Sequence, residues 1–208
     1  LLLQAKTPVV LAGTGVDWAD AREEVRELAE ALSLPVAVSY TAKGVFPENH
    51  PLALGCLGFG SRPYARKFFQ ESDLILALGA TFSEGTTMRF GHEIIAEKAK
   101  IVQIDTDPDE LGGNYPTALS IQPDARVALR AIIDEVRKRR PKPAANGSRA
   151  TAVQQAKQAW KDELERKPAN GGLSYESVMR ALNDLLTGNE ILTTSGMTGD
   201  TLRGIDAV

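Results

Sequence analysis

Short, continuous apolar runs, each closed by a glycine or a polar turn, constrain the fold of this chain more than any other feature. One run, residues 8–12, ends at Gly13, and another, residues 73–78, ends at Gly79. Strands of a parallel sheet are buried on both faces, so they are apolar throughout. Glycine lets the backbone turn sharply where such a strand ends. We therefore predict parallel strands that lead into a binding crevice at their carboxyl ends.

Helical patterns alternate with these runs up to about residue 138. Apolar residues at i, i+3, i+4 and i+7 predict a helix that starts at Asp17 and covers residues 25–32, and another that covers residues 129–136. The remaining expected segments are helices at 63–70 and 93–98, strands at 36–39, 101–105 and 118–121, and a glycine- and proline-rich loop passage at 44–63. This alternation predicts an α/β fold with a doubly wound, Rossmann-like parallel sheet.

Composition divides the chain into parts. Residues 1–138 form the predicted α/β domain, and residues 139–149, rich in proline, lysine, alanine, asparagine and glycine, form a predicted linker. Residues 150–208 start a second α/β unit that is not completed, with a polar helix at 150–167 and a strand at 190–194. The chain begins without an initiator methionine, and we expect it to be a piece cut from a longer protein.

Charge and composition argue against several classes of function. The net charge of −3 gives no basic surface for nucleic acid, and the basic residues 137–140 favour a solvated helix end over a binding patch. No apolar run approaches the ~20 residues that a transmembrane helix needs. Cys56 is the only cysteine, which excludes an internal disulfide and favours a buried structural thiol over a nucleophile. We therefore expect a cytoplasmic protein with no nucleic-acid or membrane partner.

Isolated histidines and one acidic run offer little for catalysis or metal binding. His50 and His92 have no visible triad partner, so we expect structural roles for both. Residues 105–110 are rich in acidic side chains, but their spacing fits no calcium loop. Asp105 at a strand end suits a ribose hydroxyl or the cap of its own turn, and the acids after it suit the first turn of a short helix. We favour these roles over a metal.

The turn after the first run matches a dinucleotide fingerprint only in part. The G-x-G-x-x-G pattern places its third glycine where Trp18 stands. An acidic residue that binds ribose should stand at the end of the second strand, but the end of that strand and the turn after it read Ser39-Tyr40-Thr41. These departures argue against NAD. A turn that binds no ligand stays an open alternative, because glycine at strand ends is common in α/β proteins.

A set of segments stands in a characteristic order: Pro8–Val16, Lys43–Leu52, Asp73–Ala80 and Val102–Pro108. Their order and spacing resemble the central domain of thiamine diphosphate-dependent enzymes of the acetolactate synthase and pyruvate oxidase type. The resemblance covers nearly the whole chain. It implies a parent protein that decarboxylates or ligates small 2-oxo acids.

The resemblance also implies where the cofactor would lie in that parent. An N-terminal domain would supply the glutamate that activates thiamine diphosphate, and a C-terminal domain would bind its diphosphate through Mg²⁺. Residues 150–208 would be the incomplete start of this C-terminal domain, with a diphosphate-contacting turn at Ser195, Gly196 and Met197. The chain itself would hold no catalytic residue and no metal ligand. The parent would be a homodimer or homotetramer, completed by the missing N- and C-terminal domains.

Some members of this family bind FAD or ADP along the crevice of the central domain. Carried over to this chain, the contact positions follow the ends of its strands: Gly13, Thr14, Gly15, Thr41, Gly79, Ala80, Thr81, Asp105 and Thr106. Thr81 stands where acetolactate synthases typically carry an arginine, which weakens the case for FAD more than for ADP. The other hypotheses are a stand-alone module that binds an adenine nucleotide and a purely structural scaffold.

Overall fold

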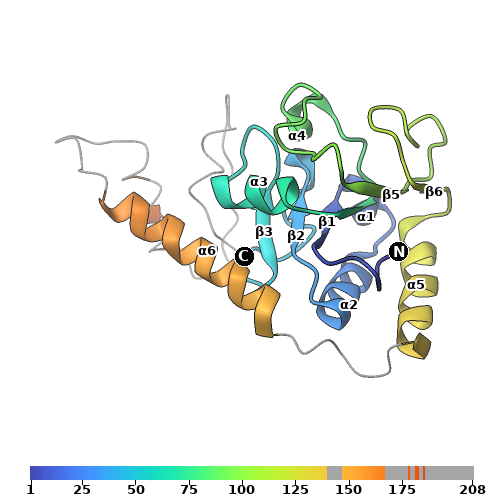
Figure 1. The fold of residues 1–208 in the computed structure, drawn as a ribbon, viewed down its shortest axis with the longest axis horizontal. Coiled ribbons are helices and arrows are strands. Elements are labelled where there is room, and N and C mark those ends of the chain that lie inside the picture. The colour runs from blue at the N-terminus through green and yellow to red at the C-terminus, as the bar shows by residue number, and fades with distance from the viewer. Residues whose placement is uncertain (140–146, 167–177, 179–180, 183–184, 186–208) are drawn as a thin grey trace.

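The computed structural model describes residues 1–139 and 147–166, together with the helical positions 178, 181, 182 and 185. The strands are β1 (Pro8–Ala12), β2 (Val36–Val38), β3 (Ala53–Cys56), β4 (Leu74–Leu78), β5 (Lys100–Ile104) and β6 (Leu119–Ile121). The helices are α1 (Thr14–Trp18), α2 (Arg22–Leu32), the 3-10 turn η1 (Tyr40–Ala42), α3 (Pro63–Gln70), α4 (Glu84–Thr87), α5 (Ala125–Arg139) and α6 (Gly147–Arg166). The strands form one parallel sheet in the order β3-β2-β1-β4-β5-β6 (Figure 1). The predicted doubly wound α/β fold is confirmed.

The central strand β1 is apolar throughout because both of its faces are covered. Val10 and Ala12 belong to one hydrophobic cluster, and Val9 and Leu11 belong to another. None of these four side chains is more than 2% exposed. Alternate residues of a strand point to opposite faces of the sheet, so the two clusters are the two sides of one core.

Helices cover both of these faces. α2 and α5 pack on the face of Val10, where Leu28 and Leu129 are buried. α3 and most of α6 pack on the opposite face, where Phe69 and Val153 are fully buried, while Ala150 near the start of α6 contacts the first cluster. In Figure 1, α5 and α6 lie at opposite ends of the molecule, with α6 beside α3 and β3. A sheet sandwiched in this way leaves the ends of its strands as the place where loops can build a site.

The first predicted helix is divided in two. Asp20 has a left-handed φ of 50°, which ends α1 and turns the chain before α2 begins. Asp17 therefore lies inside α1, where its carboxylate forms an ion pair with Arg22. The apolar spacing predicted α2 correctly, but it gave no sign of the break.

The helix expected at residues 93–98 is wrong, since these residues form turns. Ile94 and Ile95 are adjacent and both are buried in the same cluster, at 0% and 1% exposure. Neighbouring residues of a helix point about 100° apart, so a surface helix would leave one of them less buried. A single helical turn, α4, forms earlier in the chain instead.

β3 lies inside the passage that we predicted to be a loop. Its pairing with β2 shifts register after Val36, so that Ala37 pairs with Gly55 and not with Leu54. Gly55 adopts a φ of 79°, which residues with a Cβ rarely adopt. The glycine that suggested a loop is therefore the residue that permits an irregularity in an edge strand.

Two helices extend into the segment that was predicted to be a linker. α5 continues to Arg139 and α6 begins at Gly147, so both flanks of the expected 139–149 segment are helical. Val178, Leu182 and Leu185, which follow the second of these helices, are helical. The strand expected at 190–194 lies outside the described residues.

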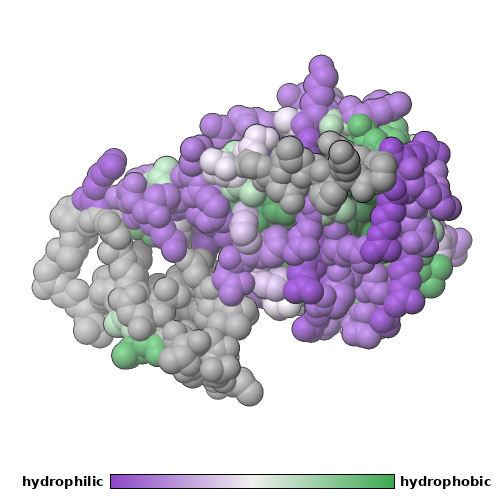
Figure 2. Space-filling model, turned by 90° about the horizontal axis from the view of Figure 1, so that it is seen from below, coloured by the Kyte–Doolittle hydropathy of each residue, from purple (hydrophilic) through white to green (hydrophobic). Residues whose placement is uncertain are grey.

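The described helices lack a membrane span, because none of them is both long enough and apolar enough to cross a bilayer. Figure 2 shows a face of the molecule that is mainly hydrophilic, with hydrophobic residues in separate patches. Trp18 on α1 is the most exposed of the large apolar side chains in the described region, at 85%.

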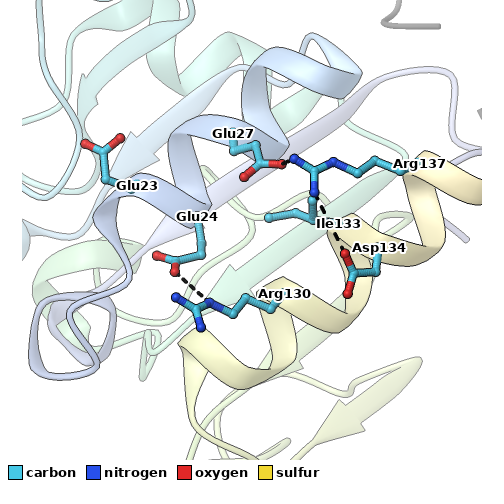
Figure 3. Close-up of a pocket in the computed structure, with 7 residues that line it drawn as sticks. All are labelled: Glu23, Glu24, Glu27, Arg130, Ile133, Asp134 and Arg137. Atoms are coloured by element: carbon cyan, nitrogen blue, oxygen red, sulfur yellow. Dashed lines mark hydrogen bonds and ion pairs between the residues drawn. The ribbon is translucent and has the colours of Figure 1, made fainter. Parts of the chain in front are cut away.

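A charged network joins α2 to α5 beside the core. Glu24 is 9% exposed at its side chain, and its Oε1 accepts hydrogen bonds from Nε of Arg126 and of Arg130, each at 3.0 Å. Glu27 forms an ion pair of 2.5 Å with Arg137 one turn further along (Figure 3). Burial by itself raises the pKa of Glu24. The hydrogen bonds from its own backbone and from the two arginines outweigh burial, so the pKa is lowered.

We predict that Glu24→Gln lowers the free energy of unfolding by about 1–2 kcal/mol at pH 7, because it weakens two charge-assisted hydrogen bonds. The pKa of Glu24 is lower in the folded protein than its ordinary value of 4.5. The carboxylate therefore stabilises the fold above pH 4.5, and this stabilisation is lost as the pH falls through the folded-state pKa. In urea titrations, the difference between wild type and variant should shrink as the pH falls below 4.5.

Glu23→Gln is the matched control for this measurement. Glu23 is the neighbour of Glu24, its side chain is 75% exposed, and it pairs with Arg26 on its own helix. Its replacement should change the free energy of unfolding by less than about 0.5 kcal/mol. If both variants lost equal free energy of unfolding, or if the loss in Glu24→Gln did not depend on pH, the stabilising role of the Glu24 carboxylate would be contradicted.

Candidate functional site

The carboxyl ends of the parallel strands bring most of the predicted site residues to one edge of the sheet. The loop after β1 carries Gly13, Thr14 and Gly15, and the loop after β4 carries Gly79, Ala80 and Thr81. Thr41 lies in η1 after β2, and Asp105 and Thr106 follow β5. β1 and β4 are the neighbours between which the strand order reverses, which is where ligands of doubly wound sheets bind. Ser195, Gly196 and Met197 lie outside the described residues.

The two glycine loops touch each other, backbone against backbone. The N–H of Gly13 donates to the carbonyl of Leu78 at 2.8 Å, and the N–H of Gly15 donates to the carbonyl of Gly79 at 3.1 Å. A Cβ added to Gly13 would lie 2.0 Å from the Gly79 oxygen. Gly79 has a φ of 52°, and a Cβ there would lie 2.5 Å from Cα of Gly15. These glycines are required by the contact between the loops.

This contact bears on the expected phosphate cradle. A nucleotide diphosphate at such a turn binds to free backbone N–H groups and fills the space left by a missing Cβ. Here the amides of Gly13 and Gly15 already have carbonyl partners, and backbone atoms of the opposite loop fill the space beside them. In this arrangement the glycine pair does not fit a diphosphate. Contacts to FAD or ADP at this edge stay a prediction.

The acidic run after β5 caps its own turn. Asp105 Oδ1 accepts the N–H of Asp107 at 3.1 Å, and Asp107 Oδ1 accepts the N–H of Asp109 at 3.0 Å. Residues 108–112 form turns and not the short helix that we expected. Burial, followed by the neighbouring carboxylates, raises the pKa of Glu110. Among the residues described here, these acids and the histidines and cysteine form no group that could hold a metal ion.

Gln103 holds the loops after β4 and β5 together, and sequence reasoning missed it. The side chain is 1% exposed; its Nε2 donates to the carbonyl of Ala80 at 3.2 Å and to that of Glu110 at 3.0 Å. Its Oε1 accepts the N–H of Gly112 at 3.0 Å. A polar residue inside the apolar strand β5 was the available signal, because a buried amide needs partners.

Cys56 and the histidines lie in structural surroundings. Cys56 is half-buried and not fully buried as expected. Desolvation is the main cause that raises the pKa of its thiol to about 11, so the thiol is protonated at neutral pH. His50 Nδ1 accepts the N–H of Leu52 at 3.1 Å, and its Nε2 lies 3.2 Å from a Glu30 carboxylate oxygen. His92 Nδ1 lies 3.2 Å from the carbonyl of Ile95.

Comparisons with known proteins point to one family. The model of the family described as "Thiamine pyrophosphate enzyme, central domain" matches residues 1–132. A probable acetolactate synthase large subunit of Methanococcus aeolicus is 38% identical over 136 residues, which are 65% of this chain and 22% of that protein. A sulfoacetaldehyde acetyltransferase of Alcaligenes xylosoxydans xylosoxydans is 37% identical over 171 residues, 79% of this chain and 28% of that protein.

A longer match extends over most of the chain. The acetolactate synthase large subunit of Parasynechococcus marenigrum is 32% identical over 196 residues, which are 93% of this chain and 30% of that protein. The chain therefore spans less than a third of the length of each of these relatives.

The loop contact at this edge gives a direct prediction. Gly13→Ala should lower the free energy of unfolding by about 3 kcal/mol, because its Cβ would overlap a backbone oxygen that cannot move without disturbing β4. Gly85→Ala is the matched control, since a Cβ there meets nothing within 4 Å. That variant should be neutral or more stable by up to about 1 kcal/mol. Urea titrations in which both variants are equally stable would refute the tight contact.

Proposed function

Because this chain belongs to the thiamine pyrophosphate enzymes and contains their central domain, we propose that it is part of a thiamine diphosphate-dependent enzyme that decarboxylates or ligates small 2-oxo acids. The observation that carries this proposal is the match of the central-domain family over residues 1–132. The acetolactate synthases among the relatives favour the same chemistry.

The residues described here support a scaffolding role for the central domain within that enzyme. The carboxyl edge is closed by the contact between the loops at Gly13 and Gly79 and by the buried amide of Gln103. The described residues offer no group of metal ligands. We therefore place Mg²⁺ and most thiamine diphosphate contacts on other parts of the protein, with Ser195, Gly196 and Met197 as the proposed contribution of this chain.

When bound, thiamine diphosphate supplies a carbanion that attacks a carbonyl and an electron sink for breaking the adjacent bond. This chain would hold its part of the enzyme in shape, and an N-terminal and a C-terminal domain of the same protein would complete the active site. A homodimer or homotetramer in the cytoplasm is the proposed assembly.

The names of the relatives suggest two candidate substrates. The relatives carry two activity names, acetolactate synthase at 38% identity over 136 residues and sulfoacetaldehyde acetyltransferase at 37% identity over 171 residues. A small 2-oxo acid such as pyruvate is our first candidate, and sulfoacetaldehyde is the second. The assay of the protein has to include both.

We expect the full-length product of the reading frame that contains this chain to release CO₂ from pyruvate. Release should require both thiamine diphosphate and Mg²⁺, and omission of either should reduce it to the uncatalysed background. The 208-residue chain alone is the control and should show no turnover. Turnover without thiamine diphosphate would refute the proposal, and consumption of sulfoacetaldehyde without pyruvate turnover would select the second substrate.

We further expect FAD, ADP and NAD to leave the thermal midpoint of the 208-residue chain unchanged. The reason is that the amides of Gly13 and Gly15 are occupied by carbonyl oxygens. A ligand present at a hundred times its dissociation constant would add about 2.7 kcal/mol, enough to raise the midpoint by about 5 °C. A rise of that size with FAD or ADP would show that the two glycine loops separate to bind a nucleotide.

A further inference from the structure

We propose that α6 is an integral part of the central unit, the α/β domain of residues 1–139. In this proposal the helix is a rigid arm that fixes where the chain continues after Arg166. The sequence placed a domain boundary near residue 138 and assigned this helix to a separate C-terminal unit. The contacts of α6 move that boundary to the end of the helix. The inference rests on these contacts alone and does not depend on the proposed function.

An apolar stripe on α6 faces the core of the central unit. Val153 has no exposed surface and belongs to the same cluster as Phe69 of α3. Ala156 and Trp160 pack against that cluster as partly buried members. These α6 residues are three and four positions apart, so they lie on one side of the helix. A helix of a separate domain would not bury a side chain such as Val153 in this core.

Trp160 contacts two residues at the start of α3, Arg62 and Tyr64. The guanidinium carbon of Arg62 lies 4.7 Å from the centre of the indole ring, a cation–π geometry. The ring of Tyr64 meets the indole edge to face, with ring centres 6.1 Å apart. Arg62 Nη1 also donates to the Tyr64 hydroxyl at 3.0 Å, which ties the two partners to each other. The partly buried indole therefore contacts two side chains that are hydrogen-bonded to each other.

Polar side chains attach α6 to backbone carbonyls at separate points of the central unit. Arg149 donates to the carbonyl of Leu32 at 3.1 Å and to that of Lys6 at 3.0 Å. Gln154 donates to the carbonyl of Pro51 at 3.1 Å, and Lys157 donates to that of Glu48 at 2.9 Å. The carbonyls belong to the end of α2, the segment before β1 and the connection from β2 to β3. Backbone acceptors move only with the fold, so these bonds fix the register of the helix.

The contacts extend along the helix. Arg149 and Trp160 are separated by about 16 Å along the axis, at 1.5 Å per residue. A helix attached over such a length cannot swing about a single point. Figure 1 shows α6 running past α3 and β3 at one end of the molecule. Whatever follows Arg166 therefore starts from a position that the central unit sets.

The two tryptophans of the chain provide the test, because Trp18 is 85% exposed and Trp160 is partly buried. In Trp18→Phe, the fluorescence reports on α6 alone; in Trp160→Phe, it reports on an exposed indole. We expect acrylamide to quench Trp160 several-fold less than Trp18 in the native protein. We also expect the Trp160 signal to change at the same urea concentration as the far-ultraviolet circular dichroism of the whole chain.

Equal quenching of the two tryptophans, or loss of the Trp160 signal while the circular dichroism is still native, would overturn the proposal. In the Trp18→Phe background, Arg62→Gln should raise the quenching of Trp160, because the indole loses its cation. Lys67→Gln in α3 is the matched control, since Lys67 is 71% exposed at its side chain and should leave the quenching unchanged. Similar effects of these two substitutions would also count against the proposed contact between Arg62 and Trp160.

Discussion

The contact between the loops that follow β1 and β4 is the constraint on which the rest of the carboxyl edge depends. Gly13 and Gly15 lie so close to Gly79 that side chains at these positions would overlap backbone atoms. The contact joins the two central strands just beyond their last paired residues, Ala12 and Leu78. Because the strand order reverses between them, this is the point where the two halves of a doubly wound sheet would otherwise separate into a crevice.

Sequence reasoning predicted the sheet because its signal is strong and local. The runs that became β1 and β4 are apolar on both faces, and the helical spacing in α2 and α5 fits a single covered face. It missed β3, because glycine in a sequence suggests a loop, whereas Gly55 lies in a strand and its positive φ accompanies a register shift. It misplaced the helix near Ile94, because two adjacent buried side chains depend on the shape of the core and not on local periodicity.

The site was predicted less completely for a related reason. The positions at the carboxyl edge follow from topology, so the sequence could place Gly13, Gly79 and Asp105 together. It could not say what the glycines touch, since a cradle for phosphate and a seat for another loop need the same residue type. Nor could it pair Gln103 with Ala80, because partners of a buried amide come from distant loops. Residue type and spacing predict which residues lie at the carboxyl edge of the sheet. Whether those residues bind a ligand or pack against another loop depends on contacts that the sequence does not show.

The two faces of the sheet are secured by different means, and this difference bears on what the domain is for. On one face, Glu24 of α2 forms ion pairs with Arg126 and Arg130 of α5, and on the other, Trp160 of α6 contacts Arg62 and Tyr64. Both contacts use residues at or beside the start of a helix: Glu24 in α2, Arg126 in α5 and Arg62 before α3. Relatives named for two different activities match this chain at 38% and 37% identity, over 136 and 171 residues. A central domain that acts as the scaffold proposed above can serve several reactions, provided that it presents the rest of the chain in a fixed position.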